Sequence, residues 1–77
     1  MNAREWIDTF AAEIGTDAPS DDEIEAILDL AAVAAHSSER IAAPVACWMG
    51  GRVEASLAEL QAAAKRVGGD SAADDST

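Results

Sequence analysis

Apolar residues recur three and four positions apart along most of this chain, which is the spacing of one face of an α-helix. The first such stripe consists of Trp6, Ile7, Phe10, Ala11 and Ile14. Asn2 and Glu5 have the spacing of a capping box, in which each side chain bonds to the other residue's backbone amide, and Gly15 is a usual helix stop. We therefore predict a first helix that is capped by Asn2, ends at Gly15 and buries Trp6 and Phe10.

A second capping box, Ser20 with Glu23, follows a turn over residues 16–19 and opens another apolar pattern. Its main apolar positions are Ile24, Ile27, Leu28, Leu30, Ala31 and Val33. Three acids crowd its first turn, where the helix dipole stabilises them, and no calcium-loop spacing surrounds them. We predict a second helix that continues toward His36 and fades near Ser37 and Ser38.

The third apolar pattern follows Pro44, a residue suited to the first position of a helix because its missing amide hydrogen costs nothing there. Pro44 also disfavours a helical conformation at Ala43, so we predict a connector over residues 37–43 that has room for a single tight helical turn. The third helix is expected to be the longest and to end at Gly68-Gly69, with a stripe of Val45, Met49, Val53, Leu57, Leu60, Ala64 and Val67.

Gly50 and Gly51 fall inside that predicted third helix. Their presence there requires an explanation, because each glycine destabilises a helix by about 1 kcal/mol relative to alanine. Three interpretations are open: a close crossing against another helix, a bend, or a backbone surface left free for a ligand. We favour the close crossing.

The composition supports an all-α fold. Tyrosine is absent, threonine occurs only three times, and no segment alternates apolar and polar residues as a strand would. Alanine, the best helix former, accounts for 19 of the 77 residues, so the core must be thin. We predict one domain over residues 1–69, a small bundle of three main helices, followed by a disordered acidic tail over residues 70–77.

The charge distribution limits the partners. The formal net charge is −10, and residues 1–40 carry two arginines against ten acids, a net charge of −8, whereas residues 41–69 have a net charge of +1. Such a surface repels phosphate backbones and anionic lipids, so we expect neither nucleic-acid nor membrane binding. With one cysteine, no internal disulfide and no cysteine-based zinc site can form. The N-terminus lacks an apolar signal-peptide core, and no apolar run is long enough to span a bilayer, so we expect a cytoplasmic protein.

His36, Glu39 and Arg40 are the most reactive side chains in the middle of the chain. A histidine at a helix C-terminus has a structural reason to be there, and no nucleophile stands at a defining spacing from it, so we assign no catalytic residue, no cofactor and no metal. For Arg40 we favour an ion pair with an acid of the first two helices over a free anion-binding role, and for Cys47 we favour a buried thiol over a reactive one. The candidate binding residues are His36, Glu39, Arg40, Pro44, Gly50 and Gly51.

Several segments together resemble a known family. They are Trp6, Ile27-Leu28-Asp29-Leu30-Ala31, His36-Ser37-Ser38-Glu39-Arg40, Ala43-Pro44-Val45 and Gly50-Gly51. Over residues 5–55 this pattern resembles a small actinobacterial helical domain of unknown function, found alone or appended to proteins of molybdopterin-guanine dinucleotide biosynthesis. The resemblance implies an accessory or interaction domain in molybdenum-cofactor guanylylation. The chain cannot be the transferase itself, because it has no glycine-rich phosphate loop after a strand.

Two classes of function remain open at this point. The first is a protein-interaction module, bound to another protein or to a second copy of itself, because a thin core gains stability from a partner. The alternative is a small-molecule-binding or catalytic site around His36, Glu39 and Arg40. A flat apolar patch would indicate the first class, and a concave pocket with convergent polar groups the second.

Overall fold

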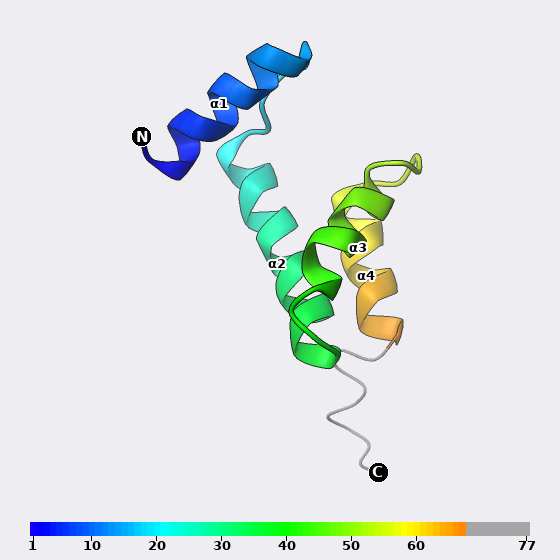
Figure 1. Cartoon of the computed structure of the whole chain (residues 1–77). Coiled ribbons are helices and arrows are strands. Elements are labelled where there is room, and N and C mark those ends of the chain that lie inside the picture. The colour runs from blue at the N-terminus through cyan, green and yellow to red at the C-terminus, as the bar shows by residue number, and fades with distance from the viewer. Residues whose placement is uncertain (68–77) are drawn as a thin grey trace.

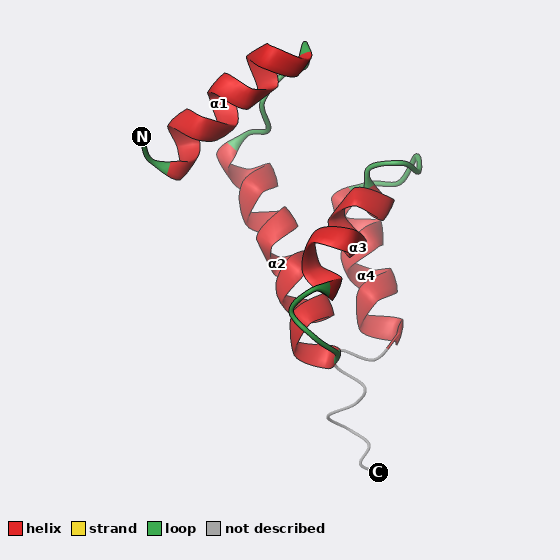
Figure 2. Cartoon of the chain, in the orientation of Figure 1, coloured by secondary structure: helices red, strands yellow, loops and turns green. Residues whose placement is uncertain are grey.

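Four α-helices make up the part of the chain that the computed structural model describes, residues 1–67 (Figures 1 and 2). They are α1 (Ala3–Ile14), α2 (Asp21–Ser37), α3 (Ala42–Gly50) and α4 (Leu57–Val67). Residues 1–67 contain no strand, so the all-α prediction is confirmed for them, whereas the count of three main helices is wrong. The predicted stop at Gly68-Gly69 and the predicted tail over 70–77 lie outside the described residues.

Both predicted capping boxes are present. The Asn2 side chain accepts a bond of 2.8 Å from the Glu5 amide, and the Glu5 carboxylate accepts one of 3.0 Å from the Asn2 amide. Ser20 and Glu23 are paired in the same way, with distances of 3.1 and 2.8 Å. Gly15 ends α1 in the left-handed conformation, at φ 79°, which only glycine adopts without strain. The ends of α1 and the start of α2 were therefore determined locally.

The predicted helix from Pro44 to Val67 is wrong, because residues 51–56 separate two helices. Ser56 caps α4: its hydroxyl accepts a bond of 3.1 Å from the Glu59 amide, and the Glu59 carboxylate accepts one of 2.8 Å from the Ser56 amide. This is a third capping box, and its Ser-x-x-Glu spacing was visible in the sequence. The continuous apolar stripe concealed it, because the stripe keeps helical spacing across the break.

The start of α3 also differs from the prediction. The helix begins at Ala42, so Ala43 is helical and Pro44 is the third residue instead of the first. The amides of a helix's first turn have no intrahelical partners, so proline is tolerated throughout that turn. The connector predicted over 37–43 is correspondingly shorter. It does contain the tight turn, in which the Ala42 amide donates to the Glu39 carbonyl at 2.9 Å and the Ala43 amide to the Arg40 carbonyl at 3.1 Å.

Tertiary packing is centred on α2, which lies against both α3 and α4 and forms with them a unit that we call the body (Figure 1). Leu30 of α2 is the one large apolar side chain of the described residues that is buried, with 5% of its surface exposed. Gly50 of α3 lies against α4, since a Cβ added there would come within 2.9 Å of Leu60 Cδ1. The close-crossing interpretation is therefore confirmed at Gly50. Gly50 is, however, the last residue of α3, whereas the sequence placed it in the interior of a longer helix.

α1 stands apart from α3 and α4 and meets the body only near the start of α2 (Figure 1). Ala11 is buried there, but Trp6 and Phe10 remain 54% and 47% exposed, so the prediction that they are core residues is wrong. Their rings stack on each other at a centroid distance of 4.9 Å. An apolar stripe shows that a helix has a face to cover, but not that its own chain covers it.

The angle between α1 and α2 is held by Arg4. Its Nη1 donates to the Pro19 carbonyl at 2.8 Å and lies 3.4 Å from Asp21 Oδ1, and its Nε lies 3.3 Å from Asp8 Oδ1. We call residues 15–20, together with these contacts, the elbow. None of the helices within residues 1–67 has the length and apolar composition that crossing a bilayer would require.

Candidate functional site

The six residues of the predicted binding set fall into two groups at opposite ends of α3. Glu39, Arg40 and Pro44 line a shallow surface depression together with Ile41. His36, on the last turn of α2, is exposed and does not line it. Gly50 and Gly51 are at the far end of α3 and line a different, apolar pocket. The structure therefore does not bring the six residues together into one site.

Arg40 is exposed, and among residues 1–67 it forms neither an ion pair nor a side-chain hydrogen bond. The expected ion pair with an acid of the first two helices is wrong within this part of the chain. Arg4 forms that kind of contact instead, through Asp8 and Asp21. Asp8 lies one turn along α1 from Arg4, and Asp21 comes within reach of Arg4 because the elbow turns the chain back beside it. The sequence predicted a turn over residues 16–19, but not which side chains that turn brings together.

The surroundings of His36 provide no nucleophile. The hydroxyl of Ser37 donates to the Val33 carbonyl at 2.7 Å, and the hydroxyl of Ser38 to the Ala34 carbonyl at 2.8 Å, so both hydroxyls are engaged with the backbone of α2. Within residues 1–67 no group of three or more histidine, cysteine or acidic side chains is placed to hold a metal ion. The geometry at this end of α2 therefore gives no support to a catalytic arrangement.

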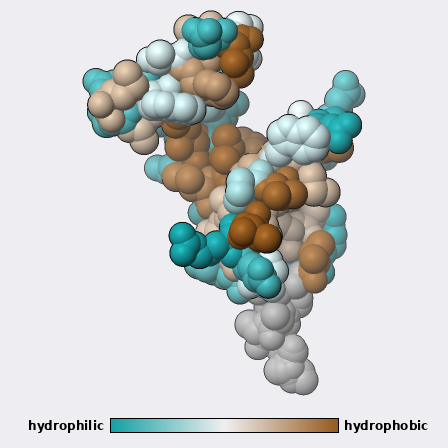
Figure 3. Space-filling model, viewed as in Figure 1, coloured by the Kyte–Doolittle hydropathy of each residue, from teal (hydrophilic) through white to brown (hydrophobic). Residues whose placement is uncertain are grey.

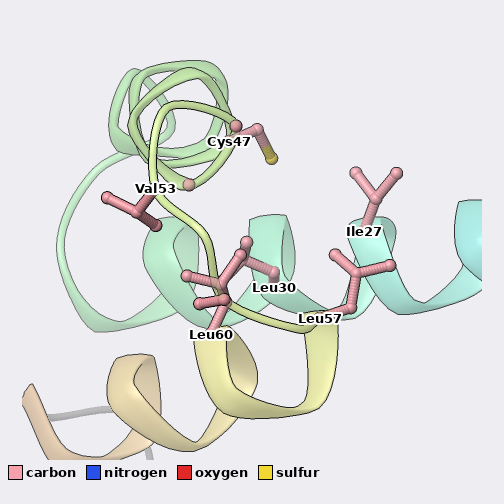
Figure 4. A pocket seen from close by; sticks show the side chains of 9 residues that line it. Ile27, Leu30, Cys47, Val53, Leu57 and Leu60 are labelled. Atoms are coloured by element: carbon pink, nitrogen blue, oxygen red, sulfur yellow. The ribbon is translucent and has the colours of Figure 1, made fainter.

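An apolar pocket of about 380 Å³ lies between the three helices of the body, at the end formed by residues 51–56 (Figure 4). Figure 4 shows Cys47 on α3, Ile27 and Leu30 on α2, and Leu57 and Leu60 on α4 around it. Cys47 is half-buried in this wall, less than the buried thiol that the sequence predicted. Gly51 contributes bare backbone to the rim, where a Cβ would find only ordinary contacts of 3.5 Å or more. Because its lining is mainly apolar, the pocket can accommodate an apolar group.

A second apolar surface runs along the outside of α3. Ile41, Val45 and Trp48, spaced by four and three residues, are 72%, 55% and 64% exposed, and we call them the α3 stripe. The Arg52 guanidinium lies over the Trp48 ring, 4.7 Å from its centroid. Figure 3 shows hydrophobic surface over α3 and also in the notch between α1 and the body. The α3 stripe was missed because the sequence pattern assigned Val45 to a core-facing position.

The comparisons with known proteins give one finding. A family model described as a domain of unknown function, DUF6457, matches residues 1–76. The comparison with curated proteins found no match, and neither did the comparison with solved structures.

Proposed function

This chain belongs to the DUF6457 family, and we propose that it is a protein-interaction module. The observation that carries the proposal is the α3 stripe, in which Val45 and Trp48 of α3 and the N-cap residue Ile41 are each more than half exposed. Single exposed apolar residues are ordinary, but a contiguous exposed patch marks an interaction surface. Tryptophan and arginine, which meet here at Trp48 and Arg52, are also the side chains that most often dominate interface energetics.

The thin core supports the same proposal. Among residues 1–67 only Ala11 and Leu30 are buried apolar residues, and a chain of this size has little other burial to offset the conformational entropy of folding. Covering the α3 stripe would remove further apolar area from water. A partner would then contribute to the stability of the domain as well as to its function.

A paired pull-down tests the proposal. The full chain is used as bait in native cell extract beside Trp48→Glu, which puts a charge in the α3 stripe, and Ala62→Glu, which adds the same charge at an exposed position of α4. We expect the parent and Ala62→Glu to retain the same protein and Trp48→Glu to lose it. Equal retention by all three baits would show that the α3 stripe is not the contact surface.

The resemblance over residues 5–55 suggests who the partner is. It supports an accessory role, in the cytoplasm, beside the enzyme that attaches guanylate to molybdopterin. Calorimetric titration of the purified chain into such an enzyme tests this directly. Binding that disappears with Trp48→Glu is the expected result, and absence of binding would remove the molybdenum-cofactor link while leaving the interaction module in place.

A small-molecule site is the second candidate, and one observation favours it. Arg40 is exposed beside Glu39 and Pro44 in the depression at the start of α3, and no carboxylate within residues 1–67 neutralises it. A free guanidinium binds carboxylate or phosphate groups. Titration with acetate and with phosphate, followed by amide NMR shifts in Arg40→Gln and in the parent, tests this; equal shifts in the two proteins would exclude it.

A further inference from the structure

The apolar side of α1 is uncovered within the described part of the chain. Trp6 and Phe10, whose rings stack on each other, are 54% and 47% exposed, and Ile14, one turn further on, is 57% exposed. We call these three residues the α1 face. Figure 3 shows that hydrophobic surface also lines the notch between α1 and the body. A helix of 12 residues is marginal in water without tertiary packing, so an occupant of the α1 face would stabilise α1 itself.

The negative charge of the described residues is concentrated around the α1 face. Residues 1–29, which comprise α1, the elbow and the first half of α2, carry one arginine against nine acids, a net charge of −8. All nine acids are exposed. Residues 30–67 carry four bases against three acids, a net charge of +1. An occupant of the α1 face therefore enters a negative field, which attracts lysine and arginine and repels phosphate groups.

Most of these acids are not neutralised within the chain. Arg4 is the one cation of residues 1–29, and it lies 3.3 Å from an oxygen of Asp8 and 3.4 Å from one of Asp21. Among residues 1–67, the other seven acids of this segment form no ion pair. Their carboxylates are available to the cations of a partner.

Glu13 is the acid that the fold explains least. Acids in the first turn of a helix, such as Glu5 in α1 and residues 21–23 in α2, are stabilised by the helix dipole. Glu13 is the last residue but one of α1, where the dipole disfavours a negative charge and no basic residue accompanies it. It follows Phe10 by three residues, so the two side chains are neighbours on the helix surface. A cationic partner would account for a carboxylate at this position.

The two observations together define the occupant. We propose that the α1 face binds a basic amphipathic helix of a partner protein, whose apolar side covers Trp6, Phe10 and Ile14 and whose lysines or arginines face Glu13 and the surrounding acids. An amphipathic helix presents apolar side chains and cations on adjoining sides, which is the combination that this surface requires. The α1 face is separate from the α3 stripe, so the proposal goes beyond the proposed function and can fail without it.

Titration of the full chain with a model peptide is the first test. The probe is a helical peptide of leucine and lysine with its leucines three and four positions apart, and the control has the same composition in scrambled order. We expect the probe to bind, and to bind more weakly as salt screens the attraction. The scrambled peptide should bind about tenfold more weakly, because it cannot place its leucines on one side. No binding of the probe, or equal binding of the two peptides, would overturn the proposal.

The two tryptophans locate the contact. Trp48→Phe leaves Trp6 as the sole tryptophan, and Trp6→Phe leaves Trp48. Binding of the probe should shift the emission of Trp6 to shorter wavelength and leave that of Trp48 unchanged, because only Trp6 is then removed from water. An unchanged Trp6 emission would overturn the proposal, whatever Trp48 does. The Trp48→Glu pull-down would still test the α3 stripe independently.

Glu13 provides the test of charge. Glu13→Gln removes the carboxylate beside Phe10, and Glu54→Gln makes the same change at an exposed loop position in the segment of net charge +1. We expect Glu13→Gln to bind the probe about threefold more weakly than the parent and Glu54→Gln to match the parent. Glu13→Gln removes an acid from the unfavourable end of α1, so weaker binding could not be attributed to unfolding of the helix. Equal affinities of the two variants would contradict the proposal.

Discussion

α1 and α3 are opposite cases of a helix in a small protein. α1 has a complete capping box, a glycine stop and an amphipathic stripe, yet most of its apolar face is uncovered. α3 has no side-chain cap at its start, carries a proline in its first turn and ends in two glycines, yet it packs along α2. Local signals therefore decide where a helix forms, and they do not decide whether it packs against other helices. A helix with poor local signals can be held by its neighbours, and one with strong signals can be left without them.

The largest destabilisation is expected where a substitution disrupts the packing of the body. Leu30→Ala should destabilise the fold by about 3 kcal/mol, because it removes the one large side chain buried among residues 1–67. Leu28→Ala is the matched control on the same helix, and with 61% of Leu28 exposed it should cost less than about 1 kcal/mol. Urea denaturation curves of the parent and of both variants, measured at the same protein concentration, give both changes in the free energy of unfolding. Equal costs for the two leucines would mean that the body is not packed around Leu30.

The crossing of α3 and α4 should be the next most sensitive feature. Gly50→Ala forces a Cβ to within 2.9 Å of Leu60 Cδ1, and we expect a loss of about 1–2 kcal/mol as Leu60 shifts. Gly51→Ala adds the same methyl group at φ −72° with no contact under 3.5 Å. It should be neutral or stabilise by up to about 1 kcal/mol, because alanine restricts the unfolded chain. Thermal unfolding of the pair resolves the difference, and a stabilising Gly50→Ala would refute the close crossing.

Removing one helix cap from α1 and one from the body compares how strongly each helix is coupled to the rest of the fold. Ser56→Ala should lower the stability of the body by about 1 kcal/mol, since the Glu59 amide loses its acceptor. Asn2→Ala removes an equivalent bond from α1. Because α1 contributes little to the body's packing, we expect faster amide exchange in α1 and little change at the α2 amides. If Asn2→Ala accelerates exchange throughout α2, then α1 and the body unfold as one unit.

The two arginines of the N-terminal half should show the smallest effects. Arg4→Ala is expected to cost about 1 kcal/mol, because it removes a charged hydrogen bond to the Pro19 carbonyl and two exposed ion pairs. Arg40→Ala should leave the denaturant midpoint within about 0.5 kcal/mol of the parent, as for other surface positions without partners. A larger cost for Arg40 than for Arg4 would reverse this assignment and restore Arg40 as a structural contact.

Several features of the fold followed from the sequence because their causes lie within one turn of helix. The boxes at Asn2 and Ser20 and the stop at Gly15 depend on atoms three or four residues apart. The third box, at Ser56, was equally local, and it was overlooked because the apolar stripe of the predicted third helix runs across the break. The sequence therefore contained the signal for the start of α4, but the apolar stripe was given more weight than the Ser56–Glu59 capping box.

The candidate sites were less predictable, because they depend on contacts between residues far apart in the chain. Trp6 and Phe10 have the pattern of core residues, and only the angle at the elbow leaves them exposed. Arg4 has an acid one helical turn away, Asp8, but only the return of the chain at Pro19 adds the Pro19 carbonyl and Asp21 as partners. The sequence by itself determined the helical class and the ends of α1 and α2, since a helix is built from hydrogen bonds between near neighbours. The tertiary structure decided which apolar faces remain uncovered, because burial depends on how separate helices are oriented in space.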